Sequence, residues 1–242
     1  MAKRTVTLAS RERVADSTIA FSLGLNGVAF PYRPGQTIDV TIPDPPHRDD
    51  AGTMRTFSLA GAPGRDHVVV ATRIRGSAFK RSLAELPLGS TLEIDGPFGS
   101  FTLPNKKTVA LLLAGGIGIT PFRSMAEDAI ARGLEHELTL LHSNRSPEEA
   151  PFLAELTAWA AASGGRLRYV PTMTRAAQAE TPWEGERRRV GPELLAELAP
   201  RDRNAARYYV AGPEGFVKGA VGSLTEIGVD EDQIVSEEFP GY

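Results

Sequence analysis

A glycine-rich turn carries the clearest chemical signal in the sequence. Residues 111–121 read LLLAGGIGITP, so an apolar run passes through glycines and reaches a proline suited to the first turn of a helix. Glycines let a ligand approach the backbone closely, and a helix N-terminus attracts phosphate. The turn therefore predicts a dinucleotide site formed by Gly115, Gly116, Ile117, Gly118, Thr120 and Pro121. A tight strand–helix turn that binds no ligand is the alternative interpretation.

A residue that contacts the ribose of a dinucleotide is expected about 20 residues beyond such a turn. The sequence there has Asn144 and Arg145, with no acidic residue before Glu148. An amide and an arginine suit a ribose phosphate at least as well as a bare ribose diol. Asn144 and Arg145 are therefore predicted to bind the cofactor, although Arg145 is equally compatible with an ordinary surface loop.

The first hundred residues have the pattern of a β domain. Short runs rich in β-branched residues are separated by Gly and Pro turn signals, which is typical of a closed barrel or sandwich. The polar segment Arg11–Asp16 is interpreted as a link between the first two strands, and one helix is predicted at Ala78–Leu86. The predicted strands are Thr5–Leu8, Ile19–Leu23, Thr37–Ile42, His67–Ile74 and Thr91–Ile94.

The rest of the chain alternates strands with helices, which predicts a parallel sheet covered on both faces. The predicted strands are Val109–Leu113, Leu138–His142, Leu167–Pro171 and Arg207–Ala211. The predicted helices are Pro121–Arg132, Pro151–Ala162, Pro192–Leu198 and Gly215–Ile227, and 176–186 is expected to be a long loop. The pattern changes near Pro104, so we predict domains at 1–103 and 108–242.

Composition excludes several classes of protein. The 27 basic and 30 acidic residues give a net charge of −3, which argues against a nucleic-acid-coating surface. Without cysteine the chain has no disulfide, cysteine-ligated cluster or thiol nucleophile, and its four histidines lack metal-ligand spacing. No apolar run approaches the ~20 residues of a membrane helix. We therefore expect no metal, nucleic-acid or membrane association, and a cytoplasmic location.

Five motifs in order resemble those of the ferredoxin–NADP reductase superfamily. They are Phe30–Gln36 (FPYRPGQ), Arg55–Ser58 (RTFS), Gly96–Gly99 (GPFG), Ala114–Pro121 (AGGIGITP) and Ala211–Pro213 (AGP). The similarity spans nearly the whole chain. It implies a flavin-binding antiparallel β-barrel domain followed by a nicotinamide-binding α/β domain, in agreement with the division inferred from periodicity.

The resemblance also implies how flavin is bound. Arg55 is expected to bind the flavin phosphate, Phe57 to stack on the isoalloxazine ring in place of the usual tyrosine, and Ser58 to contact flavin N5, with Thr56 completing the motif. The segment Ala71, Thr72 and Arg73 is expected to run under the flavin. Ser77, Ala78, Phe79 and Lys80 open a helix whose free N–H groups would face a pyrophosphate, which favours FAD over FMN.

The end of the chain allows two registers. Relatives of the plant type end in a tyrosine that covers the flavin, with a glutamate two residues earlier. Glu237 and Phe239 have that spacing, followed by three further residues, whereas Tyr242 has the terminal position without the acid. Phe239 is favoured as the ring nearest the flavin, and Ser58, Glu237, Glu238, Phe239 and Tyr242 are the predicted catalytic residues. A frayed tail is the alternative.

Two further segments are expected to bind the nicotinamide cofactor. Ala211, Gly212, Pro213 and Glu214 replace the frequent Cys-Gly-Pro of the family, which removes a thiol but leaves space for hydride transfer. Thr174 and Arg175 occupy the place where relatives hold the 2′-phosphate. This favours NADP, with NAD as the alternative.

These features predict an FAD-dependent NAD(P)H oxidoreductase that passes electrons to a separate acceptor. A ferredoxin or flavodoxin is the favoured partner, with a small molecule as the alternative. Basic residues that could attract an acidic partner are Arg33, Arg73, Arg75, Lys80 and Arg81, although they are equally compatible with a solvated face. The alternative functions are a flavin reductase that uses flavin as a substrate, and a non-catalytic flavin-binding electron-transfer subunit.

Overall fold

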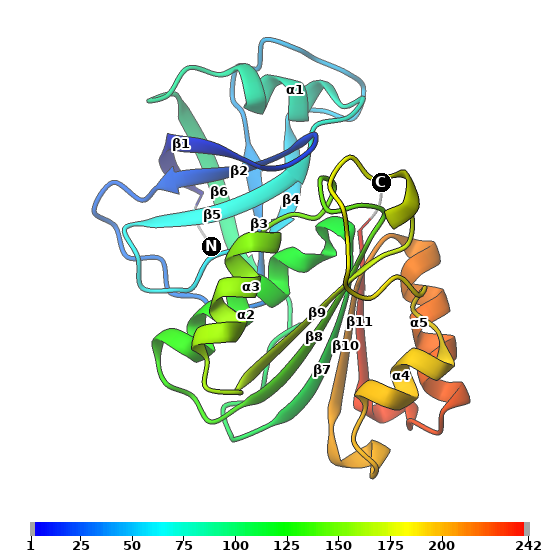
Figure 1. The fold of residues 1–242 in the computed structure, drawn as a ribbon. Helices are drawn as coiled ribbons and strands as arrows, with labels where there is room; N and C mark the ends of the chain where they lie inside the picture. The colour runs from blue at the N-terminus through cyan, green and yellow to red at the C-terminus, as the bar shows by residue number, and fades with distance from the viewer. Residues whose placement is uncertain (1–2, 240–242) are drawn as a thin grey trace.

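The computed structural model describes residues 3–239, and Figure 1 shows two sheets of different kinds. The N-terminal sheet is antiparallel, with strand order β4-β3-β6-β1-β2-β5. Its edge strands meet where the Ala60 N–H donates to the Val69 carbonyl oxygen at 2.8 Å, which closes the sheet into a barrel. The strands are β1 (Arg4–Ala15), β2 (Thr18–Gly24), β3 (Thr37–Thr41), β4 (Met54–Ser58), β5 (His67–Arg73) and β6 (Thr91–Phe98).

Alternating apolar side chains fill the barrel, as expected for strands with one buried face. Ile38 and Val40 of β3 meet Leu92 and Ile94 of β6 in this core. Helix α1 (Ala78–Glu85) covers one end of the barrel by burying Phe79 and Leu83, and Ser77 caps its N-terminus. The antiparallel barrel predicted from the sequence is therefore confirmed.

The C-terminal sheet is parallel, with strand order β11-β10-β7-β8-β9. It contains β7 (Val109–Gly115), β8 (Glu137–Asn144), β9 (Leu167–Met173), β10 (Arg207–Gly212) and β11 (Ile234–Glu238). Helices α2 (Thr120–Ala131) and α3 (Leu153–Ala162) cover the face toward the barrel, and α4 (Pro192–Leu198) and α5 (Glu214–Glu226) cover the other face (Figure 1). The predicted parallel sheet covered on both faces is confirmed.

Strand β7 shows why the sheet needs two helical layers. Ala110, Leu112 and Ala114 pack into the core with α2 and α3. Leu111 and Leu113 point the other way, into the core formed with α4 and α5. A strand buried on both faces is apolar at every position, which explains the continuous run in the sequence. The predicted domain boundary at 103–108 lies in the connection between β6 and β7 and stays a prediction.

Some local predictions were wrong. Arg11–Asp16 is not a link, because β1 is one strand that runs through Ala15, pairing Arg11 with Phe21 and Arg13 with Ile19 of β2. The strands β4 and β11 were not predicted at all. Both are short segments in which polar side chains interrupt the apolar pattern, and both lie beside the largest cavity described below. In the part of the chain from residue 3 to residue 239, no helix is long and apolar enough to span a bilayer.

Candidate functional site

A cavity of about 740 Å³ lies where the barrel meets the parallel sheet, a size typical of cofactor sites. The barrel domain forms most of it, through β4, the start of α1 and residues of β3, β5 and the 49–51 segment, and the first residue of α2 and the end of β11 complete it. The lining residues are Thr37, Asp49, Ala51, Met54, Arg55, Thr56, Phe57, Ser58, Ala71, Arg75, Gly76, Ser77, Lys80, Thr120, Glu237, Glu238 and Phe239. The structure thus brings together most of the residues predicted to bind flavin with those predicted to cover it.

Pairing with β3 places the residues of β4 along one wall of the cavity. Ser58 pairs with Thr37, and Arg55 pairs with Val40. Phe57 is 6% exposed and packs in the barrel core, with its ring centroid 5.9 Å from that of Phe79. Phe79 is fully buried in that core and does not line the cavity, so its expected contact with flavin is not supported.

One end of the cavity is built for an anion. The Arg55 guanidinium lies 5.4 Å from the centre of the Phe79 ring. Burial, and then the charge of Arg55, lower the pKa of Lys80, which shows that the two cations share a confined space. An anion bound beside these two cations and the helix N-terminus would be stabilised by both charges. This donor set and the size of the cavity fit a flavin with a diphosphate.

An acidic side chain occupies part of this anion site. Asp49 Oδ2 accepts a hydrogen bond from the Ala78 N–H at 2.9 Å, and Oδ1 lies 3.6 Å from Arg55 Nη2. The Ser77 hydroxyl oxygen accepts from the Lys80 N–H at 3.4 Å. The expectation that these N–H groups of α1 are free was therefore wrong, because Asp49 and Ser77 cap the helix.

The end of β11 forms the opposite wall. In the parallel register of β10 and β11, Glu237 lies beside Ala211, and the Phe239 N–H donates to the Gly212 carbonyl oxygen at 2.9 Å. Glu238 and Phe239 both line the cavity. Glu237 and Phe239 therefore lie on the same wall of the cavity, and the choice between the two registers stays a prediction. Tyr242 lies outside the described residues.

Glu237 is the acid whose surroundings disturb its protonation most clearly in the cavity. Burial raises the pKa of the Glu237 carboxyl, and a side-chain hydrogen bond with Ser58 opposes this increase. Oxygen Oε2 is buried, and residues 3–239 offer it no hydrogen-bond partner. A half-buried carboxyl next to a hydroxyl can hold a proton and release it through that hydroxyl, which is the behaviour required of a general acid.

The glycine turn is shaped first by packing. A Cβ atom on Gly118 would lie 2.2 Å from the Ala211 carbonyl oxygen, and one on Gly115 would lie 2.6 Å from the Phe216 ring. Gly116 has a φ of +54°, and the short helical turn Gly116–Ile119 leads into α2. Thr120, the first residue of α2, reaches the cavity. The packing explanation accounts for two of the glycines, and dinucleotide binding by the turn stays a prediction.

A buried histidine holds this turn and was missed as a functional residue. His142 Nε2 lies 2.9 Å from the Gly116 carbonyl oxygen, and Nδ1 lies 2.9 Å from the Tyr169 hydroxyl. Because a carbonyl can only accept, Nε2 carries the hydrogen and Nδ1 accepts from Tyr169. Burial lowers the pKa of His142 to about 4. His142 lies in the apolar strand β8, and nothing in that sequence pattern predicted that its neutral imidazole would contact the glycine turn that follows β7.

Several predicted cofactor residues lie outside the cavity. Thr72 is buried in β5, where it pairs with Ile19. The Arg73 guanidinium lies 3.4 Å from the Glu149 carboxylate and 3.8 Å from the ideal Cβ position of Gly116, so Arg73 connects the barrel with the glycine turn. Ala71 lines the cavity, and the predicted place of Thr72 and Arg73 under the flavin stays a prediction.

The predicted phosphate-binding residues gather at the carboxyl ends of β8 and β9. The Asn144 carbonyl oxygen accepts from the Thr174 N–H at 2.9 Å and from its hydroxyl at 3.1 Å, and the Arg175 N–H donates to the Arg145 carbonyl at 2.8 Å. Both polar side-chain atoms of Asn144 are buried without partners. At the neighbouring end of β10, Pro213 precedes α5, whose first residue, Glu214, forms an ion pair with Lys218.

Comparison with known proteins identifies the family. Residues 112–222 match the family described as the oxidoreductase NAD-binding domain. The chain is 32% identical over 223 residues to "Ferredoxin--NADP reductase B" of Sorangium cellulosum (strain So ce56), covering 88% of each chain. The chain belongs to the ferredoxin–NADP reductase superfamily. As a member of that superfamily it is an NAD(P)H-dependent flavin oxidoreductase that uses FAD.

Other relatives in the ferredoxin–NADP reductase superfamily serve oxygenases. The chain is 29% identical over 214 residues to the phenol 2-monooxygenase reductase component DmpP of Pseudomonas sp. (strain CF600). The match covers 87% of this chain but only 58% of that protein. The fold matches a ferredoxin NADP⁺ reductase of Neisseria gonorrhoeae solved with bound FAD and NADP, with a TM-score of 0.80, 22% identity and coverage of 98% and 99%.

Proposed function

We propose that this protein takes hydride from NADPH onto FAD and passes electrons to a ferredoxin or flavodoxin. The observation that carries the proposal is the single cavity in which Arg55 and Ser58 of the barrel meet Thr120 of α2 and Glu237 of β11. Arg55 and Lys80 would bind the diphosphate of FAD, and Phe57 would contact its ring system. The bound flavin supplies the conversion between two-electron and one-electron transfer.

The residues around the cavity have defined tasks in this proposal. Thr120 and the glycine turn orient the dinucleotide, and Phe239 covers the cavity until the nicotinamide enters. The Glu237 carboxyl, whose pKa burial raises, hydrogen-bonds with Ser58 and would orient this hydroxyl at the flavin side of the cavity. Thr174 and Arg175 support NADP over NAD, because a hydroxyl and a guanidinium at the carboxyl edge of the sheet suit a 2′-phosphate.

The acceptor is proposed from charge and from relatives. Of the five basic residues considered in the sequence, Arg75 and Lys80 line the cavity, whereas Arg33 lines a separate cavity. The relative from Sorangium cellulosum is named for ferredoxin. An acidic carrier protein would be attracted to the cationic end of the cavity, and its reduction should slow as salt increases. A small-molecule acceptor would show no such dependence.

One observation favours the alternative in which flavin is an exchangeable substrate. Asp49 already binds the Ala78 N–H and approaches Arg55, so an incoming diphosphate must displace a carboxylate. The purified protein would then be colourless and would accelerate reduction of added FAD or FMN.

Anaerobic spectroscopy tests the proposal. The purified protein is expected to show flavin absorbance that NADPH bleaches faster than NADH. Faster bleaching by NADH would reverse the choice of nicotinamide, and a colourless protein would favour the flavin reductase. A yellow protein that neither nucleotide bleaches would contradict hydride transfer and favour the electron-transfer subunit.

A further inference from the structure

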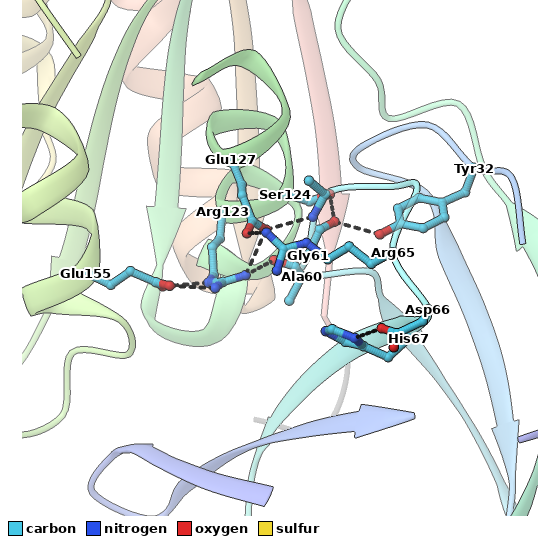
Figure 2. Close-up of polar contacts among 11 residues, drawn as sticks. Tyr32, Ala60, Gly61, Arg65, Asp66, His67, Arg123, Ser124, Glu127 and Glu155 are labelled. Carbon is cyan, nitrogen blue, oxygen red and sulfur yellow. Dashed lines mark hydrogen bonds and ion pairs between the residues drawn. The ribbon is translucent and has the colours of Figure 1, made fainter. Parts of the chain in front are cut away.

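Helix α2 forms hydrogen bonds with three consecutive residues that follow β4, and Figure 2 labels two of them, Ala60 and Gly61. Arg123 Nη1 donates to the Ala60 carbonyl oxygen at 2.6 Å, and the Ser124 hydroxyl donates to the Gly61 carbonyl oxygen. The Ala62 N–H donates to Glu127 Oε2 at 2.7 Å. One face of the first two turns of α2 thus fixes the backbone of residues 60–62, which we call the clamped segment.

The Arg123 side chain is itself fixed from the opposite side. Its Nε and Nη2 both donate to the Glu155 carboxylate of α3 at 2.7 Å (Figure 2). The guanidinium carbon lies 4.8 Å from the Phe152 ring centre and 5.1 Å from that of Trp159. Arg123 is only 9% exposed, so salt screens these contacts weakly. A planar guanidinium satisfies this two-sided arrangement, and a lysine ammonium does not.

The clamped segment is connected rigidly to the flavin side of the cavity. Ala60 comes two residues after Ser58, and the intervening Leu59 N–H donates to the Gln36 carbonyl oxygen at 2.9 Å. The Ala60 N–H is fixed by Val69 on the neighbouring strand. Movement of the clamped segment would therefore move Ser58.

The other end of the connection reaches the nicotinamide side. Arg123 lies one helical turn, roughly 5 Å, beyond Thr120, which lines the cavity and directly follows the glycine turn. A short path therefore connects Thr120 with Ser58. It runs along one helical turn from Thr120 to Arg123, through the hydrogen bond to the Ala60 carbonyl, and back two residues to Ser58. The Arg123 side chain does not line the cavity.

We propose that Arg123 is a positioning residue that sets the approach between nicotinamide and flavin for hydride transfer. In that step the C–H bond of the dihydronicotinamide breaks, an N–H bond forms on the flavin, and the electron pair travels with the hydrogen, so the nicotinamide is oxidised and the flavin reduced. This inference rests on the proposed function. Misplacement by about 1 Å is enough to slow such a transfer ~100-fold.

The test substitutes Arg123→Lys, which keeps the positive charge and loses the planar fork. Arg132→Lys is the matched control, because Arg132 caps the C-terminus of α2, its side chain is 63% exposed, and its ion pair is with Asp128 of the same helix. We expect flavin reduction at saturating NADPH to slow roughly 10–100-fold in Arg123→Lys, with KM changed less than about 3-fold. The nicotinamide–flavin charge-transfer absorbance should fall in parallel. The control should match the wild type.

Hydrogen exchange in the flavin-free protein provides a measurement independent of turnover. The Ala62 amide should exchange faster in Arg123→Lys than in the wild type or in Arg132→Lys, since the clamped segment is released. Ser124→Ala removes a different bond to the same segment and should show both effects if Arg123→Lys does not fold.

The proposal would be overturned if the folded variants reduced the flavin as fast as the wild type and showed the same charge-transfer absorbance. A loss confined to KM or to the melting temperature would also overturn it, because a merely structural residue would give that pattern. If neither nucleotide reduces the wild-type protein, the proposed function fails, and unchanged exchange at Ala62 would separately refute the clamp.

Discussion

His142 should make folding stability depend on pH between about 5 and 7.5 in a way that one substitution removes. Its pKa is lowered from 6.5 to about 4, mainly by burial. Below pH 6.5, His142 is protonated in the unfolded chain but stays neutral in the folded protein until the pH approaches 4. The stabilising difference is complete above pH 6.5 and is lost as pH falls toward the folded value.

The size of the effect follows from these two values. Between about pH 7.5 and pH 5 the free energy of unfolding should fall by ~2 kcal/mol through His142 alone. The folded structure explains the sign, since a protonated Nδ1 could no longer accept from the Tyr169 hydroxyl. His136, whose pKa is also lowered by burial, adds a change of the same sign.

His142→Gln isolates the contribution. A glutamine amide can donate to the Gly116 carbonyl at one end and accept from Tyr169 at the other, but it does not titrate. Urea unfolding followed by fluorescence of Trp159 and Trp183 would give the free energy of unfolding of both proteins at both pH values. The contribution of His136 cancels in the comparison. If the two proteins lose the same stability on acidification, the assignment of a buried neutral imidazole at the glycine turn is refuted.

Three further outcomes are expected. Gly118→Ala should lower the free energy of unfolding, measured by urea titration, by about 3 kcal/mol, because the new Cβ meets the β10 backbone. Gly222→Ala, which places its Cβ in open space on α5, should leave this free energy unchanged. Equal effects of the two substitutions would contradict the packing described for Gly118. Arg55→Gln should weaken FAD binding ~10–100-fold by fluorescence titration, against no change in exposed Arg48→Gln. Glu237→Gln should raise the melting temperature more at pH ~8 than at pH ~5, since the raised pKa makes the charged form costly; a uniform shift would refute this.

The architecture could be predicted from sequence because periodicity records burial. Strand β7 is apolar on both faces and α4 begins at a proline, so both were located closely. Strands β4 and β11 were missed because each carries site residues, such as Arg55 and Glu237, where a purely structural strand would place apolar ones. Hydrophobic periodicity does not predict a strand where polar residues of a candidate site replace the apolar residues that packing would require.

Residues that line the candidate site were predicted only from the motifs, and the residues that hold them in place were not predicted. Ser58, Thr120 and Phe239 meet at one cavity, as the resemblance implied. The roles of Asp49, Arg123 and His142 depend on partners far away in the sequence, including Ala78 N–H for Asp49 and Glu155 for Arg123. Nothing in the spacing of the sequence specifies which distant backbone group such a side chain will contact.

The pairing of β10 with β11 has a consequence for the order of events at the cavity. Strand β10 ends in Ala211 and Gly212, which belong to the predicted nicotinamide segment, and the same Gly212 carbonyl accepts the Phe239 N–H. The backbone of Phe239, which lines the cavity, is therefore hydrogen-bonded to the end of a strand in the parallel sheet. If the proposed nucleotide moved the end of β10 on binding, this hydrogen bond would move Phe239 with it, so binding and uncovering of the flavin would be coupled through one backbone contact.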